Sequence, residues 1–282
     1  MNPIIVATML SFIASLVWVV IIYKLDKHEK EPISLLLKLF VTSMLLSFVA
    51  GFLNSLDEAL LGKFGSLVLV GFVEEGVKFL AVWLIVFKNK EFNSPIDGVI
   101  YASISALGFA FIENIEYNYL MVKLIPLAGE ARMHHALFER SFLPFMHVLI
   151  SSIWGYALGM YRLYIFDKKK LILFFLLGAI VHSAYDITVS ILPFVMTFTF
   201  AILISVFVFR VIHLNRISNR DIKFFINCPT CSKKVPENSL FCKFCGSKIK
   251  LKPFEVVSVY CRFCLSKVEK DWKYCKSCGK EL

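Results

Sequence analysis

The chain has 282 residues, of which 58% are hydrophobic, and its mean hydropathy is +0.71. An average soluble domain contains roughly 45–50% apolar residues, so this composition excludes an ordinary soluble protein and predicts a polytopic membrane protein. The formal net charge is +10. Most of it belongs to residues 214–282, which carry 15 Lys and Arg against 6 Asp and Glu.

Seven apolar stretches are long enough to cross a bilayer, because a hydrocarbon core about 30 Å thick requires roughly 20 apolar residues of helix. The first is followed by lysines and shows no small-residue cleavage site, so we expect a retained span and not a cleaved signal. The predicted spans are 3–23, 33–56, 66–87, 96–116, 142–165, 171–192 and 194–213.

Basic residues alternate between the two sides of the membrane as the positive-inside rule requires. Segments 88–90, 162–170 and 210–220 are rich in Lys and Arg, whereas the loop 57–65 and the turn at 193 carry one Lys between them. We therefore expect a multi-pass protein of the cell membrane, with its N-terminus outside and its C-terminal domain in the cytoplasm.

The third predicted span contains two adjacent glutamates and a lysine, Glu74, Glu75 and Lys78. Helical geometry stacks Lys78 on Glu74 and turns Glu75 about 100° away. One glutamate could then be held by an ion pair while the other addresses a substrate, an ion or water. A purely structural ion pair between Glu74 and Lys78 is the competing interpretation.

Further ionisable residues lie in the later spans, where a charged side chain costs several kcal/mol and is by default a sign of function. In the predicted topology these residues fall at similar depths in the outer half of the bilayer, so they could meet. Each histidine taken alone could equally be a packing residue. They are Glu113 in the fourth span, His147 in the fifth, and His182 with Asp186 in the sixth.

Two chemistries fit this set of residues. His147 and His182 with a carboxylate are ligand types of a catalytic zinc site that keeps a position open for water, with a spare glutamate as general base. Without metal, Glu75 could activate water while the histidines form an oxyanion site. The sequence leaves both alternatives open.

All eight cysteines follow a linker at 214–227 and form four C-x-x-C pairs. Two pairs that each supply two thiolates close a Cys₄ zinc shell, so we predict zinc ribbons at 228–246 and 261–279, each holding one structural zinc. Disulfides are disfavoured because the predicted compartment is reducing. The ligands are Cys228, Cys231, Cys242, Cys245, Cys261, Cys264, Cys275 and Cys278.

The predicted fold class is therefore an all-α polytopic membrane domain at 1–213, of about seven transmembrane helices, followed by a small cytoplasmic double zinc-ribbon domain. The cysteine pattern resembles the double zinc ribbon found as an accessory module in bacterial proteins. We expect the ribbons to dock a cytoplasmic protein or the membrane surface, and nucleic acid is the less favoured partner despite the basic charge.

The helical part resembles the PrsW family of intramembrane proteases. The matching motifs are Glu74-Glu75-x-x-Lys78, Phe109-x-x-x-Glu113, His147 early in the next span, and His182-x-x-x-Asp186. The resemblance implies an enzyme that cleaves a membrane protein near the outer face, as on a single-pass anti-sigma factor.

The same resemblance implies the roles of individual residues. Glu74 and Glu75 would be catalytic carboxylates, and His147 and His182 would be ligands of a third, catalytic zinc or oxyanion donors. Glu113 and Asp186 would be ligands or would orient them, and Lys78 stands where the related prenyl proteases have arginine.

Two other functions compete with proteolysis. One is a non-catalytic receptor or immunity protein whose ribbons recruit a cytoplasmic partner, and the other is a cation-coupled carrier, which the lack of an evident inverted repeat disfavours. The sequence does not identify the substrate, the scissile bond, the metal content of the site, the role of the ribbons or the oligomeric state.

Overall fold

The computed structural model describes residues 3–25, 30–128, 130–162, 166–191, 196–218 and 225–236, and a few residues between 242 and 279. Within its helices, the side chains of residues 3–4, 6–7, 121–143, 189–198, 200–201 and 216–218 are not described. The chain divides into two units, Met1–Asn219 and Arg220–Leu282, and each is described by itself. Cys261, Cys264, Cys275 and Cys278 lie outside the described residues, so the second predicted ribbon is not assessed by the structure.

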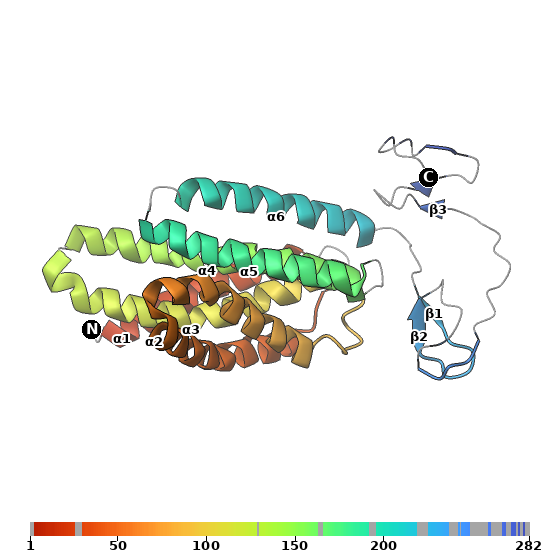
Figure 1. Ribbon diagram of the computed structural model, residues 1–282, viewed down its shortest axis with the longest axis horizontal. Helices are drawn as coiled ribbons and strands as arrows, with labels where there is room; N and C mark the ends of the chain where they lie inside the picture. Colours follow the sequence, from red (N-terminus) through yellow and green to blue (C-terminus); the bar gives the residue numbers. More distant parts are fainter. Residues whose placement is uncertain are drawn as a thin grey trace. The chain divides into compact units, whose positions relative to one another are not determined.

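The first unit is a bundle of helices that lie roughly along one direction (Figure 1). Four of the described helices are long and apolar enough to cross a membrane, namely α1, α2, α3 and α5, so the membrane character is confirmed while the count of seven spans stays a prediction. The helices are α1 Pro3–Leu25, α2 Ile33–Ile85, α3 Asp97–Ala128, α4 Glu130–Arg162, α5 Lys168–Ile191 and α6 Met196–Ser218.

Helix α2 contains the second and third predicted spans, and it folds back on itself near its middle. Gly62 interrupts the helical backbone with φ 72° and ψ 172°, a conformation open mainly to glycine. Asn54 Nδ2 donates to Glu74 Oε1 at 3.3 Å, although twenty residues of straight helix would separate them by about 30 Å. The two halves of α2 are therefore antiparallel neighbours, as the two predicted spans require.

Helix α3 is the central element of the bundle. Of its membrane-length window, 78% is buried, against 22–33% for α1, α2 and α5, and it packs against α1, α2 and α4. Close approach depends on small residues: a Cβ added at Gly98 would lie 2.3 Å from the carbonyl oxygen of Gly155, and one at Gly159 would lie 2.1 Å from that of Pro95. Backbone contact between α3 and α4 therefore holds the two helices in a fixed register.

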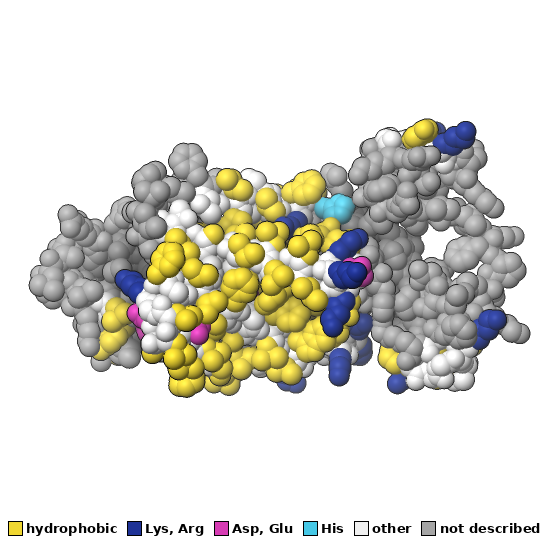
Figure 2. All heavy atoms as spheres, in the orientation of Figure 1, with side chains coloured by type: hydrophobic (Ala, Val, Ile, Leu, Met, Phe, Trp, Pro, Cys, Tyr) yellow, Lys and Arg dark blue, Asp and Glu magenta, His cyan; other side chains and the backbone are white. Residues whose placement is uncertain are grey.

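Side chains on the bundle surface match a lipid environment. Figure 2 shows hydrophobic side chains over the helices, and Lys and Arg gathered at the end of the bundle where α5 begins and α6 ends. Phe48, Phe52 and Phe64 on α2 are 61–71% exposed, which water would disfavour and acyl chains would not. The cytoplasmic placement of the basic end stays a prediction.

The second unit contains short hairpins. Strand β1 (Phe225–Asn227) pairs antiparallel with β2 (Lys234–Pro236), with Ile226 opposite Val235, and β3 (Val259–Tyr260) pairs with β4 (Lys267–Val268). The turn between β1 and β2 carries Cys228 and Cys231. Such a hairpin places two thiols at its tip, where a second pair can close on them.

Candidate active site

The seven ionisable residues predicted from the sequence come together inside the helical unit, from four different helices. Contacts within the set link every member to another, from 2.8 Å between Lys78 Nζ and Glu75 Oε1 to 3.7 Å between His182 Nε2 and Asp186 Oδ2. The second half of α2 supplies Glu74, Glu75 and Lys78, α3 supplies Glu113, α4 supplies His147, and α5 supplies His182 and Asp186.

Glu75 is the most enclosed carboxylate of this cluster, with an exposure of 0%. Its Oε1 accepts hydrogen bonds from Lys78 Nζ and from His182 Nδ1, both at 2.8 Å. Its Oε2 accepts from Ser151 Oγ at 2.6 Å and from Trp154 Nε1 at 2.7 Å. An ionised carboxylate offers about four acceptor positions, so these four protein donors fill the acceptor positions of Glu75.

Lys78 is fully buried and pairs first with Glu75, not with Glu74 as the i, i+4 spacing suggests. Its Nζ lies 2.8 Å from Glu75 and 3.6 Å from Glu74 Oε2. The same Nζ lies 3.1 Å from His147 Nδ1 and 4.4 Å from the centre of the Phe109 ring. Because an ammonium group donates only, Nδ1 of His147 is the acceptor, and the neutral ring carries its hydrogen on Nε2.

Glu74 differs from Glu75 in having an oxygen that accepts no hydrogen bond from the described residues, although Lys78 Nζ lies 3.6 Å from it. This atom, Oε2, is buried and lies 3.6 Å from His182 Nε2. Since His182 donates a hydrogen bond from Nδ1–H to Glu75, the neutral ring has its lone pair on Nε2. A carboxylate oxygen that accepts no hydrogen bond from the described residues and a nitrogen lone pair thus face one another, an arrangement that suits a proton or a cation between them.

The same residues could hold a metal ion. One carboxylate oxygen of Glu74 and one ring nitrogen each of His147 and His182 lie within 4.8 Å of one another. Two imidazoles and one glutamate are a known donor set of catalytic zinc sites. The orphaned Oε2 of Glu74 and the chemistry of these donors therefore fit zinc.

Glu113 and Asp186 lie at the rim of the cluster. Glu113 Oε2 is 2.9 Å from His147 Nε2, and the side chains of Glu113 and Asp186 are 25% and 31% exposed. The other two carboxylates of the cluster are at most 10% exposed. Water and a substrate would therefore approach from the side of these two residues.

Three polar contacts of the cluster come from residues that were not among the predicted site residues, Asn54, Ser151 and Trp154. Two of them carry a signal in hindsight, because Ser151 and Trp154 follow His147 at i+4 and i+7 and so lie on the same face of α4. Asn54 carries none, since its contact depends on the reversal of α2 at Gly62.

The first zinc ribbon has the geometry expected from its sequence. Cys228 Sγ lies 3.6 Å from Cys245 Sγ, and Cys231 Sγ lies 3.6 Å from Cys242 Sγ, close to the roughly 3.8 Å edge of a tetrahedron with Zn–S bonds of 2.3 Å. A hydrogen bond from the Ser247 hydroxyl lowers the pKa of the Cys228 thiol to about 5 and also lowers the pKa of Cys245. The thiolate is the form that binds zinc.

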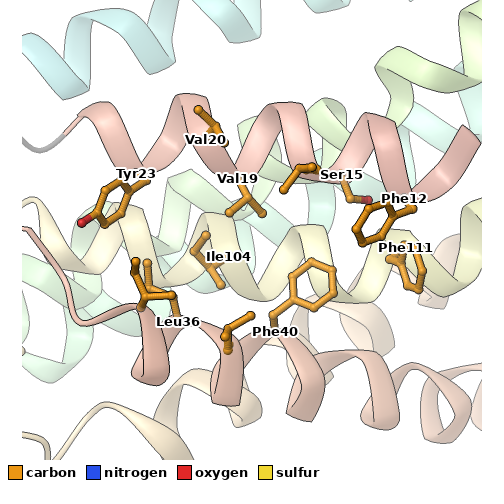
Figure 3. A pocket seen from close by; sticks show the side chains of 12 residues that line it. Phe12, Ser15, Val19, Val20, Tyr23, Leu36, Phe40, Ile104 and Phe111 are labelled. Carbon is orange, nitrogen blue, oxygen red and sulfur yellow. The ribbon is translucent and has the colours of Figure 1, made fainter. Parts of the chain in front are cut away.

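An apolar cavity of about 470 Å³ lies elsewhere in the bundle, between α1, α2 and α3 (Figure 3). None of the seven site residues lines it, and the residues of its walls include no carboxylate or imidazole. Its lining residues are Phe12, Ser15, Leu16, Val19, Val20, Tyr23, Ile33, Leu36, Leu37, Phe40, Ile104 and Phe111.

Two family models match the chain, one over its helical unit and one over its cysteine-rich tail. The family described as PrsW family intramembrane metalloprotease matches residues 31–212, and the double zinc ribbon family matches residues 228–279. No solved structure matches the chain.

Three curated relatives carry the name Protease PrsW. The protein of Geobacillus kaustophilus is 31% identical over 58% of this chain and 71% of its own length. Those of Bacillus subtilis and Oceanobacillus iheyensis are each 32% identical over 58% of this chain, and over 73% and 74% of their own lengths. The resemblance drawn from the four motifs is thereby confirmed: the chain belongs to the PrsW family of intramembrane proteases and carries a double zinc ribbon after its helical unit.

Proposed function

We propose that the chain hydrolyses a peptide bond in a single-pass membrane protein of the anti-sigma-factor kind, close to the outer membrane face. The observation that supports this most is the unequal environment of the two adjacent glutamates. Glu75 accepts hydrogen bonds from four donors, whereas Oε2 of Glu74, opposite His182 Nε2, accepts none from the described residues and has only the longer ion pair with Lys78. Glu74 is therefore the catalytic carboxylate, and Glu75 holds its neighbours in place.

The residues divide the work of hydrolysis among them. Glu74 Oε2 takes a proton from the attacking water, whose oxygen forms the new bond to the scissile carbonyl carbon. The Nε2–H of His147, which faces Glu113 Oε2 at 2.9 Å without substrate, donates to the carbonyl oxygen instead as that oxygen gains negative charge. Glu74 then returns the proton to the amide nitrogen as the C–N bond breaks, which releases a carboxylic acid and an amine.

The site also accommodates zinc, held by Glu74, His147 and His182. When bound, the metal would polarise the scissile carbonyl and make a bound water more acidic. A ring nitrogen of His147 that held zinc would present its lone pair to the metal, so it could not donate to the substrate carbonyl. With zinc bound, Glu113 and Asp186, the more exposed carboxylates of the cluster, would be the candidates to accept a proton from water.

The first experiment compares the N-termini of membrane proteins in cells that carry the wild type, Glu74→Gln or Glu58→Gln. Glu58 is an exposed glutamate of the same helix and serves as the matched control. We expect one new N-terminus, at the outer juxtamembrane edge of a single-pass protein, in the wild type and in Glu58→Gln and its loss in Glu74→Gln. A terminus that survives in Glu74→Gln would contradict the proposed site.

We also propose that the zinc ribbons lie in the cytoplasm, with the N-terminus outside, and that they bind a cytoplasmic protein partner. The grouping of Lys and Arg at the end of the bundle where α6 ends supports this orientation (Figure 2). A cysteine label placed at Ser218, the last residue of α6, should react only after the membrane is made permeable. Labelling of intact cells would reverse the orientation.

A further inference from the structure

Two side chains of α4 contact the cluster without taking part in the proposed chemistry. Ser151 Oγ and Trp154 Nε1 both donate to Oε2 of Glu75, at 2.6 and 2.7 Å. All three residues have an exposure of 0%. The sequence motifs of the site contain neither residue, and no step of the hydrolysis requires them to touch substrate.

Ser151 and Trp154 can affect His182 because the two oxygens of the Glu75 carboxylate lie in one rigid plane. Donors on Oε2 fix the plane of the Glu75 carboxylate, and this plane sets where Oε1 points. Oε1 accepts from His182 Nδ1 at 2.8 Å, so the position of Oε1 decides both the tautomer and the orientation of that imidazole. The lone pair of His182 Nε2 then faces Glu74.

Trp154 is held in place by its own neighbours. Its ring packs edge-on against Phe79 with 5.3 Å between ring centres. A Cβ added at Gly178 of α5 would lie 3.3 Å from Trp154 Cδ1, so α5 passes close to the indole. The indole therefore cannot turn away without repacking, and its N–H is a fixed reference for the carboxylate.

We propose that Ser151 and Trp154 are positioning residues of this protease, which act through Glu75 to hold His182 in its working orientation. The expected effect on kinetics rests on the proposed function, whereas the hydrogen bonds of Ser151 and Trp154 to Glu75 are independent of it. Helix α4 therefore supplies His147 to the site. One and two turns later, the same helix supplies the two donors that align His182 of α5.

The kinetic test uses the membrane protein whose N-terminus identifies it as the substrate. In Ser151→Ala and in Trp154→Phe we expect kcat to fall about 10- to 100-fold with KM unchanged within twofold, the loss typical when the groups that orient a metal-binding histidine, here His182, are removed. The matched controls are Ser152→Ala, a buried neighbour whose hydroxyl bonds the Leu149 carbonyl, and Trp83→Phe, and both should keep wild-type kcat.

A double-mutant cycle separates positioning from general stability. If both residues act through Glu75, adding either substitution to Glu75→Gln should lower kcat by less than twofold further. Full additivity of the two losses would overturn the proposal, as would a Trp154→Phe variant with wild-type kcat.

A spectroscopic measurement tests the contact without any substrate. The chain has four Trp, so the indole region of the ¹H–¹⁵N spectrum in detergent has four signals, and the one absent in Trp154→Phe belongs to Trp154. We expect Glu75→Gln and Ser151→Ala to move this signal and Ser152→Ala to leave it in place. An unmoved signal would refute the positioning contact, whereas a moved signal with no cleavage by the wild type would refute only the proposed function.

Discussion

Lys78→Met removes a buried cation that lies between the two buried glutamates of α2. The ammonium is 0% exposed and lies 2.8 Å from Glu75 and 3.6 Å from Glu74. Breaking a buried ion pair by removing one partner costs about 3–5 kcal/mol, because the remaining charge is left without compensation. A domain of roughly 200 residues loses about 2–4 °C in Tm per kcal/mol, so the expected loss is roughly 6–20 °C.

Thermal unfolding in detergent, followed by Trp fluorescence, measures this loss. Lys63→Met is the control, since Lys63 is an exposed lysine of the same helix and its loss should change Tm by less than about 2 °C. The double variant Lys78→Met/Glu75→Gln removes both charges and should recover at least half of the lost Tm without recovering cleavage. Equal Tm values for Lys78→Met and Lys63→Met, or a double variant less stable than Lys78→Met, would refute the buried ion pair as the source of stability.

Three further predictions concern other parts of the chain. Glu75→Gln should lower the free energy of unfolding by about 1–3 kcal/mol in detergent, because the amide nitrogen of Gln would face hydrogen-bond donors that now meet a carboxylate oxygen. A variant as stable as the wild type would argue against four donors on this carboxylate. Gly62→Ala should cost about 1–3 kcal/mol because its backbone has φ 72° and ψ 172°, whereas Gly51→Ala, in a regular helix with open space around it, should cost nothing measurable in the same unfolding assay. Cys242→Ser should reduce the bound zinc of the purified tail by one ion and abolish the hairpin of the first ribbon, as seen by metal analysis and NMR, and an unchanged zinc count would contradict the Cys₄ shell.

Much of the site could be predicted because membrane depth is a strong constraint. Ionisable residues inside apolar spans are few, so Glu74, Glu113, His147 and His182 stand out one by one, and their similar depths in the predicted topology suggest a meeting point. The structure brings these four residues together, along with their sequence neighbours Lys78 and Asp186.

The distinction between the two adjacent glutamates could not be predicted. Residues at i+3 and i+4 are both neighbours on a helix surface, so spacing alone allows Lys78 to pair with either glutamate. Glu75 is favoured because donors from α4 and α5 converge on it, and this convergence depends on how three helices pack. Only the arrangement in space shows that Glu74 keeps the free oxygen.

The boundaries of the elements show a similar division. The sequence predicts two spans at 33–56 and 66–87, and the structure has one helical segment, Ile33–Ile85, that reverses at Gly62. A hydropathy pattern detects the two apolar stretches, but it does not show that the residues between them are also helical on both sides of Gly62. This reversal brings Asn54 to Glu74, a contact that no local pattern contains.

The most direct test of the catalytic role of Glu74 uses the purified protease, the substrate identified from cells, and mass measurement of the products. The wild type and Glu58→Gln should yield two fragments whose masses add up to the substrate plus one water. Glu74→Gln, at equal Tm, should be slower by about 10²–10⁴-fold, the range expected for loss of a general base. A folded Glu74→Gln variant that cleaves within tenfold of the wild-type rate would contradict the assignment of Glu74 as the catalytic carboxylate.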